Sequence, residues 1–84
     1  MPLPDGPQDV PHDRLQEVRK RSLTIAGHRT SISLEPVFWD ALKDAADERG
    51  QSLAGLVAEI DEARATSLSS AIRVWLFERA RQGR

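Results

Sequence analysis

The stretch from Arg21 to Leu34 constrains the fold most, because it is the only run with β-strand character in a chain whose later part has helical periodicity. Backbone N–H and C=O groups of a strand need hydrogen-bond partners, and an unpaired strand edge is an open template for another strand. The stretch also contains no acidic residue. We therefore expect it to pair with the same stretch of a second copy, which would form an intermolecular antiparallel two-stranded ribbon.

The apolar positions of this stretch change parity near Gly27. Ile32 and Leu34 lie at even positions and share one face, because strand side chains alternate, whereas Leu23 and Ile25 lie at odd positions. A glycine within a strand pattern is typical of a β-bulge, which adds one residue and reverses the alternation. The alternative is a hairpin that turns near Gly27. We favour the bulged strand at this point.

Three helices are predicted after the strand, at about 36–49, 53–64 and 69–81. Pro36 has the fixed φ of a first helical position, Gly50 is a typical residue just past a helix end, and Ser52 is a good N-cap. The third helix is apolar around more than half of its circumference, since Val74 and Phe77 lie outside its main stripe. A helix of this kind is usually buried on two sides, which favours a dimer.

Apolar residues at three- and four-residue spacing, together with the inward residues of the strand, form the predicted core. We assign them to the core of a dimer, because a core from 84 residues is marginal unless oligomerisation adds buried area. The predicted dimer core consists of Ile32, Leu34, Phe38, Trp39, Leu42, Leu56, Val57, Ile60, Ile72, Trp75 and Leu76.

The predicted organisation is a flexible N-terminal arm over residues 1–20 and a folded domain over residues 21–82. The arm contains four of the five prolines. The fold class is mainly α with one β-strand. The chain has no cysteine, which excludes disulfides and thiolate metal sites and makes the cytoplasm the expected compartment. No apolar run is long enough for a membrane span, so no membrane partner is expected.

Catalysis has little support in the sequence. The histidines are His12, in the arm, and His28, in the strand, and neither has a nucleophile and an orienting carboxylate at a suitable spacing. The chain has no glycine-rich phosphate loop, and its acids show no metal-site spacing with histidine. We expect no enzymatic activity, no cofactor and no bound metal.

Nucleic-acid binding has a physical basis in the same strand. Arg29, Ser31 and Ser33 share its polar face, and the major groove of B-DNA admits a two-stranded ribbon whose side chains can read base edges. A solvent-facing strand is often polar without binding anything. The charge distribution favours DNA, because residues 18–34 hold four cations and no acid while residues 35–62 hold eight acids and two cations.

Two further features could contact DNA phosphates. The basic tripeptide Arg19, Lys20 and Arg21 precedes the strand, and a run of this kind supplies the cations that neutralise the backbone. The N-terminus of the second helix, at Ser52, Leu53 and Ala54, offers free N–H groups that can bind an anion without a charged side chain. Either feature also has an ordinary structural role, as a solubilising run or as a helix cap.

A polar-faced strand, a helix that starts at proline and ends at glycine, and a Gly-x-Ser turn into a second helix together resemble the ribbon-helix-helix family. The segment "RTSISLEPVFWDALKDAADERGQSLAGLVAEI" carries this pattern over residues 29–60. With "LSSAIRV" it resembles small bacterial ribbon-helix-helix domain proteins. The resemblance implies an intertwined homodimer whose outward strand residues read bases in the major groove. It leaves open whether the second or the third helix completes the dimer core.

The leading hypothesis is a homodimeric, sequence-specific transcriptional regulator, such as a repressor, that binds double-stranded DNA. The alternative is a dimeric interaction module, or an antitoxin-like protein, that binds a protein partner and never contacts DNA. The two hypotheses differ in the salt dependence of DNA affinity, which falls steeply with ionic strength when phosphates are neutralised.

Overall fold

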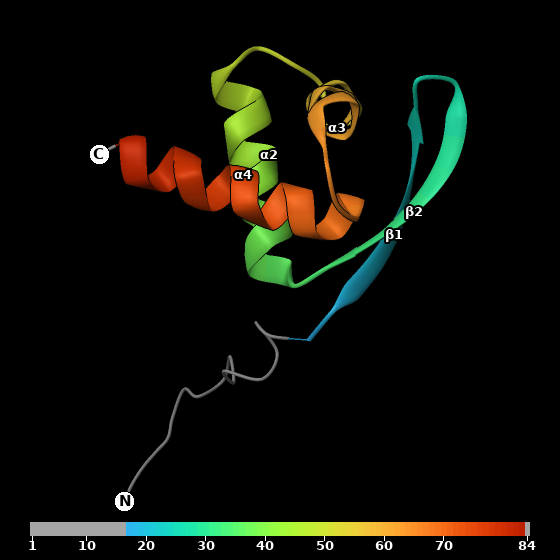
Figure 1. The fold of residues 1–84 in the computed structure, drawn as a ribbon, viewed down its shortest axis with the longest axis horizontal. Coiled ribbons are helices and arrows are strands. Elements are labelled where there is room, and N and C mark those ends of the chain that lie inside the picture. The colour runs from blue at the N-terminus through green and yellow to red at the C-terminus, as the bar shows by residue number, and fades with distance from the viewer. Residues whose placement is uncertain (1–16, 84) are drawn as a thin grey trace, which may run out of the picture.

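The computed structural model describes residues 17–83 and contains a hairpin followed by three helices (Figure 1). The elements are β1 (Arg19–Ile25), β2 (His28–Leu34), α2 (Pro36–Glu48), α3 (Leu53–Ala63) and α4 (Leu68–Gln82). The predicted bounds of the three helices agree with the structure to within one residue at each end. Most of the predicted N-terminal arm lies outside the described residues, but its last two residues, Arg19 and Lys20, belong to β1.

The stretch predicted as one strand forms two strands that pair with each other. β1 and β2 are antiparallel neighbours in a two-stranded sheet, with Ile25 opposite His28 next to the turn and Arg19 opposite Leu34 at the open end. The favoured bulged strand is therefore wrong, and the hairpin is correct. β2 thus has a neighbour within its own chain, and pairing with a second chain remains a prediction.

The turn explains why the apolar parity changes. Ala26 and Gly27 both have positive φ, at 52° and 84°, as expected for a two-residue type I′ turn, whose twist matches that of the flanking strands. A two-residue turn places odd positions of β1 opposite even positions of β2, and residues directly opposite each other share a face. Leu23, at an odd position, thus lies on the same face as Ile32, at an even one, without any bulge.

The helix boundaries have local causes. Pro36 begins α2, and Gly50, with φ of 68°, ends it. The N–H of Gln51 donates to the Ala46 carbonyl at 2.9 Å and that of Gly50 donates to the Asp47 carbonyl at 3.1 Å, which is the Schellman pattern. At the start of α3, the Ser52 hydroxyl accepts a hydrogen bond from the Gly55 N–H at 2.9 Å.

One hydrophobic core joins the inner face of the hairpin to all three helices. No polar or charged residue among those described is buried in it. Nine residues of the predicted core are buried within this one chain, while Phe38 and Trp75 are half-buried. The buried residues are Ile25, Ile32, Leu34, Trp39, Leu42, Ala45, Ala46, Leu56, Val57, Ile60, Ile72 and Leu76.

The turn can be tested by changing the residue that has an unfavourable conformation. An L-residue with a side chain costs about 1–2 kcal/mol in the left-handed region, and asparagine adopts that region more readily than alanine. We expect Ala26→Asn to raise the free energy of unfolding by about 1 kcal/mol, measured by denaturant titration.

Gly27→Ala is the matched control at the neighbouring position. No atom lies within 4 Å of the place where its Cβ would sit, so any loss comes from the backbone conformation alone. This variant should lower the free energy of unfolding by about 1 kcal/mol. Equal effects of the same sign for the two variants would contradict the proposed turn.

Candidate nucleic-acid interface

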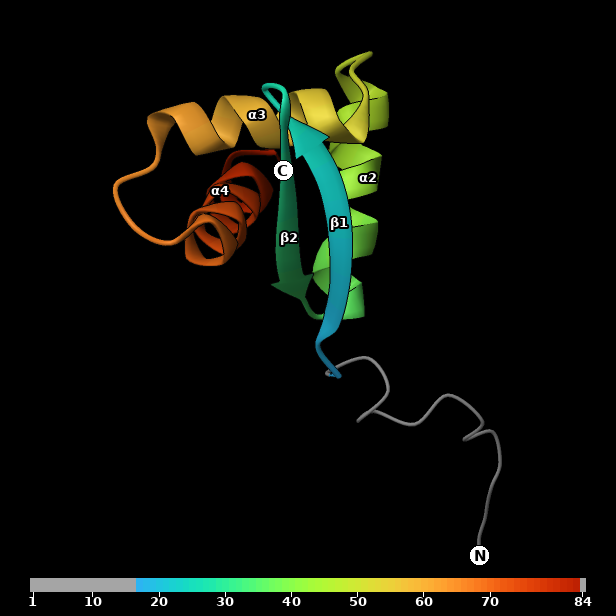
Figure 2. The same cartoon turned by 90° about the vertical axis from the view of Figure 1, so that its right-hand side faces the viewer.

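The outer face of the hairpin is a polar surface that the helices do not cover. Figure 2 shows β1 and β2 in front of the three helices. The buried residues of both strands, Ile25, Ile32 and Leu34, belong to the core cluster that they form with the helices. The register places six polar side chains on the opposite, outward side, which we call the outer face. It comprises Lys20 opposite Ser33, Ser22 opposite Ser31, and Thr24 opposite Arg29.

The structure places the three predicted base-reading residues together on this outer face. Arg29 and Ser31 are exposed, and Ser33 is half-buried at the open end of the hairpin. Two further hydroxyl residues, Ser22 and Thr24 of β1, lie on the same face and were not among the predicted base-reading residues. The signal was present in the sequence, because a two-residue turn at Ala26 and Gly27 would have brought these hydroxyls opposite Ser31 and Arg29.

The basic tripeptide is divided between the two faces of β1. Lys20 lies on the outer face, whereas Arg19 and Arg21 alternate to the other side, opposite Leu34 and Ile32. All three cations are exposed. Arg19 and Arg21 therefore do not lie on the outer face, and phosphate contact by them remains a prediction.

Two hydrogen bonds hold the open end of the hairpin on the helices. The indole Nε1–H of Trp39 in α2 donates to the backbone carbonyl of Arg19 at 3.0 Å. The hydroxyl of Ser69, in the first turn of α4, donates to the backbone carbonyl of Ser33 at 3.0 Å. In addition, the Arg21 guanidinium lies over the Trp39 ring, 5.2 Å from its centroid. The hairpin is thus fixed from both strands.

The cations of the hairpin differ from the arginines of the helix region in their pairing. Five helix-region arginines form ion pairs with carboxylates, namely Arg49 with Glu59, Arg64 with Asp61, Arg73 with Glu35, Arg79 with Glu48, and Arg81 with Glu78. Among residues 17–83, no carboxylate forms an ion pair with the four hairpin cations. The positive charge of the hairpin is therefore available to an anionic partner.

Glu35 lies between β2 and α2, and its surroundings favour the ionised carboxylate. Its pKa lies below the ordinary value because a backbone hydrogen bond at Glu35 itself favours the carboxylate. Desolvation acts in the opposite direction, and the hydrogen bond and charge of Arg73 add to the lowering. The pair joins the end of the hairpin to α4, with 3.1 Å between Arg73 Nε and Glu35 Oε1.

The predicted anion site at the start of α3 forms a helix cap. Ser52 is exposed, its hydroxyl oxygen accepts from the Gly55 N–H, and Leu53 and Ala54 are half-buried. Figure 2 shows α3 behind the turn end of the hairpin, with its N-terminal end on the side of β1. The geometry gives this helix end a structural role, and phosphate contact by these residues remains a prediction.

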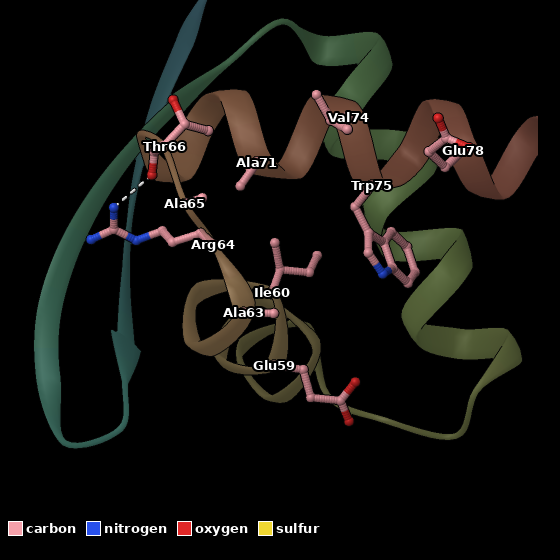
Figure 3. Close-up of a pocket in the computed structure, with 10 residues that line it drawn as sticks. All are labelled: Glu59, Ile60, Ala63, Arg64, Ala65, Thr66, Ala71, Val74, Trp75 and Glu78. Carbon is pink, nitrogen blue, oxygen red and sulfur yellow. Dashed lines mark hydrogen bonds between the residues drawn. The ribbon is translucent and has the colours of Figure 1, made fainter.

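A second surface, on α4, is apolar. Val74 and Phe77 are 58% and 63% exposed. Val74 borders two hollows, of which one, of about 570 Å³, lies between α3 and α4 beside Ile60 and Trp75 (Figure 3). The other, of about 620 Å³, lies between α2 and α4 and is also lined by Val37 and Phe77. We call the exposed residues Val74 and Phe77 of α4, together with Val37 of the neighbouring α2, the apolar α4 face.

The described residues contain no group of three or more His, Cys, Asp or Glu side chains placed to hold a metal ion. Within the same part of the chain, no helix combines the length and the apolar character that crossing a membrane requires. His28, the histidine of the hairpin, is exposed beside the turn.

Comparison with known proteins assigns the family. The family model described as "Ribbon-helix-helix domain" matches residues 18–80, so the chain belongs to the ribbon-helix-helix domain family. This assignment confirms the resemblance seen in the sequence.

A solved structure, that of an uncharacterized protein from Bordetella pertussis Tohama I, is similar to this chain. The two are 29% identical and superpose with a TM-score of 0.66, over 79% of this chain and 58% of that protein. The chain thus spans less than two thirds of that protein's length. No curated protein matches the chain significantly.

Trp39→Phe tests the attachment of the hairpin to α2. The change keeps an aromatic ring but removes the donor to the Arg19 carbonyl and part of a buried side chain, so the free energy of unfolding should fall by about 1–3 kcal/mol. Denaturant unfolding and amide exchange in β1 measure the effect.

Trp75→Phe is the matched control, since the Trp75 ring is half-buried and its indole N–H has no hydrogen-bond partner among the described residues. It should have the smaller effect, and it should leave amide exchange in β1 unchanged. A larger loss for Trp75→Phe would contradict the anchoring role of Trp39.

Proposed function

We propose that this protein is a homodimeric, sequence-specific DNA-binding transcriptional regulator, and that the outer face of its hairpin enters the major groove. The observation that carries the proposal is the contrast between unpaired hairpin cations and ion-paired helix arginines. Paired arginines on the helices present little net positive charge, whereas the hairpin combines free cations with hydroxyls on one uncovered face. Membership of the ribbon-helix-helix family supports the same function.

The chemistry of the outer face suits DNA. The guanidinium of Arg29 can donate two hydrogen bonds to O6 and N7 of guanine, and the hydroxyls of Ser31 and Ser33 can donate to or accept from base edges. Lys20, Arg19 and Arg21 lie at the open end, where they would contact phosphates and supply the sequence-independent part of the affinity.

The dimer is part of the proposal, and the apolar α4 face is its interface. Large apolar side chains as exposed as Val74 and Phe77 mark an interaction site when they cluster. α3 and the buried side of α4 already pack in the core of one chain, so the exposed apolar surface is left to Val74 and Phe77 of α4, with Val37 of α2 beside the same hollow. A second copy would cover Val37, Val74 and Phe77 and would place two hairpins on one DNA molecule.

We further propose that the protein acts in the cytoplasm without catalysing a reaction, as a repressor that occupies a promoter. The second candidate function, a protein-interaction module, is favoured by the apolar α4 face alone. It would place a different protein where the second copy is proposed to bind.

If the hairpin binds DNA, removal of a cation from the hairpin should lower DNA affinity, and removal of a cation from α2 should not. Arg29→Ala should weaken binding to the preferred sequence by about 1–3 kcal/mol and relax specificity, because it removes a base contact. Lys43→Ala removes the same charge from an exposed position of α2 and should change affinity little. Fluorescence anisotropy with cognate and random duplexes at several salt concentrations measures both.

In the same titrations, the logarithm of affinity should fall linearly with the logarithm of salt concentration, by about 0.9 for each phosphate neutralised. Negligible affinity even at low salt would rule out the DNA-binding function and leave the interaction module.

Phe77→Glu tests the dimer. A charge in the centre of the apolar α4 face would have to be desolvated in the interface, so the variant should sediment as a folded monomer in analytical ultracentrifugation. Asp44→Arg, at an exposed position on α2 outside the apolar α4 face, is the matched control and should sediment as a dimer. A monomeric wild-type protein would contradict the proposed interface.

A further inference from the structure

The two strands of the ribbon present different side chains, although both come from one chain. The pairs on the outer face are Lys20 with Ser33, Ser22 with Ser31, and Thr24 with Arg29. If the same strand of two copies formed the ribbon, one set of side chains would repeat about a twofold axis. The ribbon of this protein lacks that symmetry.

Resting on the DNA-binding function proposed above, we infer that Ser22 and Thr24 of β1 read base edges together with β2. One chain then carries a complete reading surface. The short sequence that it recognises has no dyad symmetry of its own, and a palindrome in the operator arises only from the two chains of the dimer.

The placement of these hydroxyls supports a reading role. Ser22 and Thr24 are both exposed; Ser22 lies in the middle row of the outer face, opposite Ser31, and Thr24 lies in the row beside the turn, opposite Arg29. A ribbon that lies in the groove with its outer face toward the bases would bring side chains of both strands within reach of base edges. Serine and threonine hydroxyls can each donate and accept there.

The spacing of the outward residues fits the spacing of base pairs. Alternate residues of a strand are about 6.8 Å apart, which is close to two base-pair steps of about 3.4 Å. The three rows of the outer face therefore span roughly four base-pair steps. We expect a recognition element of about four or five base pairs for each chain.

Selection of bound sequences from a library of random duplexes, with the full-length protein, tests the inference. Ser22→Ala and Thr24→Val should each reduce discrimination at their own base pairs by about 2- to 10-fold, the effect of losing one neutral hydrogen bond. Thr66→Ala removes an exposed hydroxyl in the segment between α3 and α4 and should leave the selected sequences unchanged. The wild-type element should lack dyad symmetry.

The inference would be overturned if the selected DNA sequence were a palindrome centred on one ribbon and stayed the same for both the Ser22→Ala and Thr24→Val proteins. That result would leave DNA binding intact. Failure of the wild-type protein to enrich any sequence, or to bind random duplex at low salt, would overturn the proposed function and the inference together.

A disulfide across the hairpin tests whether the ribbon that binds DNA forms within one chain. Leu23 and Thr30 lie directly opposite each other on the inner face, and the chain has no cysteine of its own. The oxidised Leu23→Cys, Thr30→Cys protein should run as a single chain on a non-reducing denaturing gel and should bind DNA as tightly as its reduced form. A chain-to-chain crosslink, or binding lost on oxidation and restored by reduction, would show that the strands exchange between chains.

Discussion

The two-residue turn at Ala26 and Gly27 is the constraint on which the rest of the structure depends. Positive φ at both positions sets the register of β1 against β2, and a shift of one residue would reverse the face of every side chain in a strand. The register places Ile25, Ile32 and Leu34 in the core and leaves hydroxyls and cations on the outer face. The register of the two strands thus produces both the core contact of the hairpin and the surface proposed to bind DNA.

The helices hold the ribbon through contacts to both of its strands. Trp39 binds the open end of β1 through its indole N–H, and Ser69 binds β2 through its hydroxyl. Five acids of the helix region form ion pairs with nearby arginines, while Asp40, Asp44, Asp47 and Glu62 form none among the described residues. An almost neutral chain therefore has a hairpin whose positive charge is not cancelled locally, which net charge alone would not reveal.

The helical part of the fold could be predicted from the sequence, because Pro36, Gly50 and Ser52 mark boundaries through local chemistry. The family could also be predicted, from the order of these marks after a polar-faced strand. The pairing of β1 with β2 could not be settled, since a bulge and a two-residue turn both change apolar parity, and Ala26 is an uncommon residue at positive φ. The preference for a bulge left Ser22 and Thr24 unassigned.

The most direct measurement of the central claim is an NMR titration of the isotopically labelled protein with a random-sequence duplex at low salt. We expect the largest changes in amide and side-chain chemical shift at residues of β1 and β2, above all at Ser22, Arg29 and Ser31. Changes confined to α2 and α4 around Val74 and Phe77, with the hairpin signals unmoved, would contradict it.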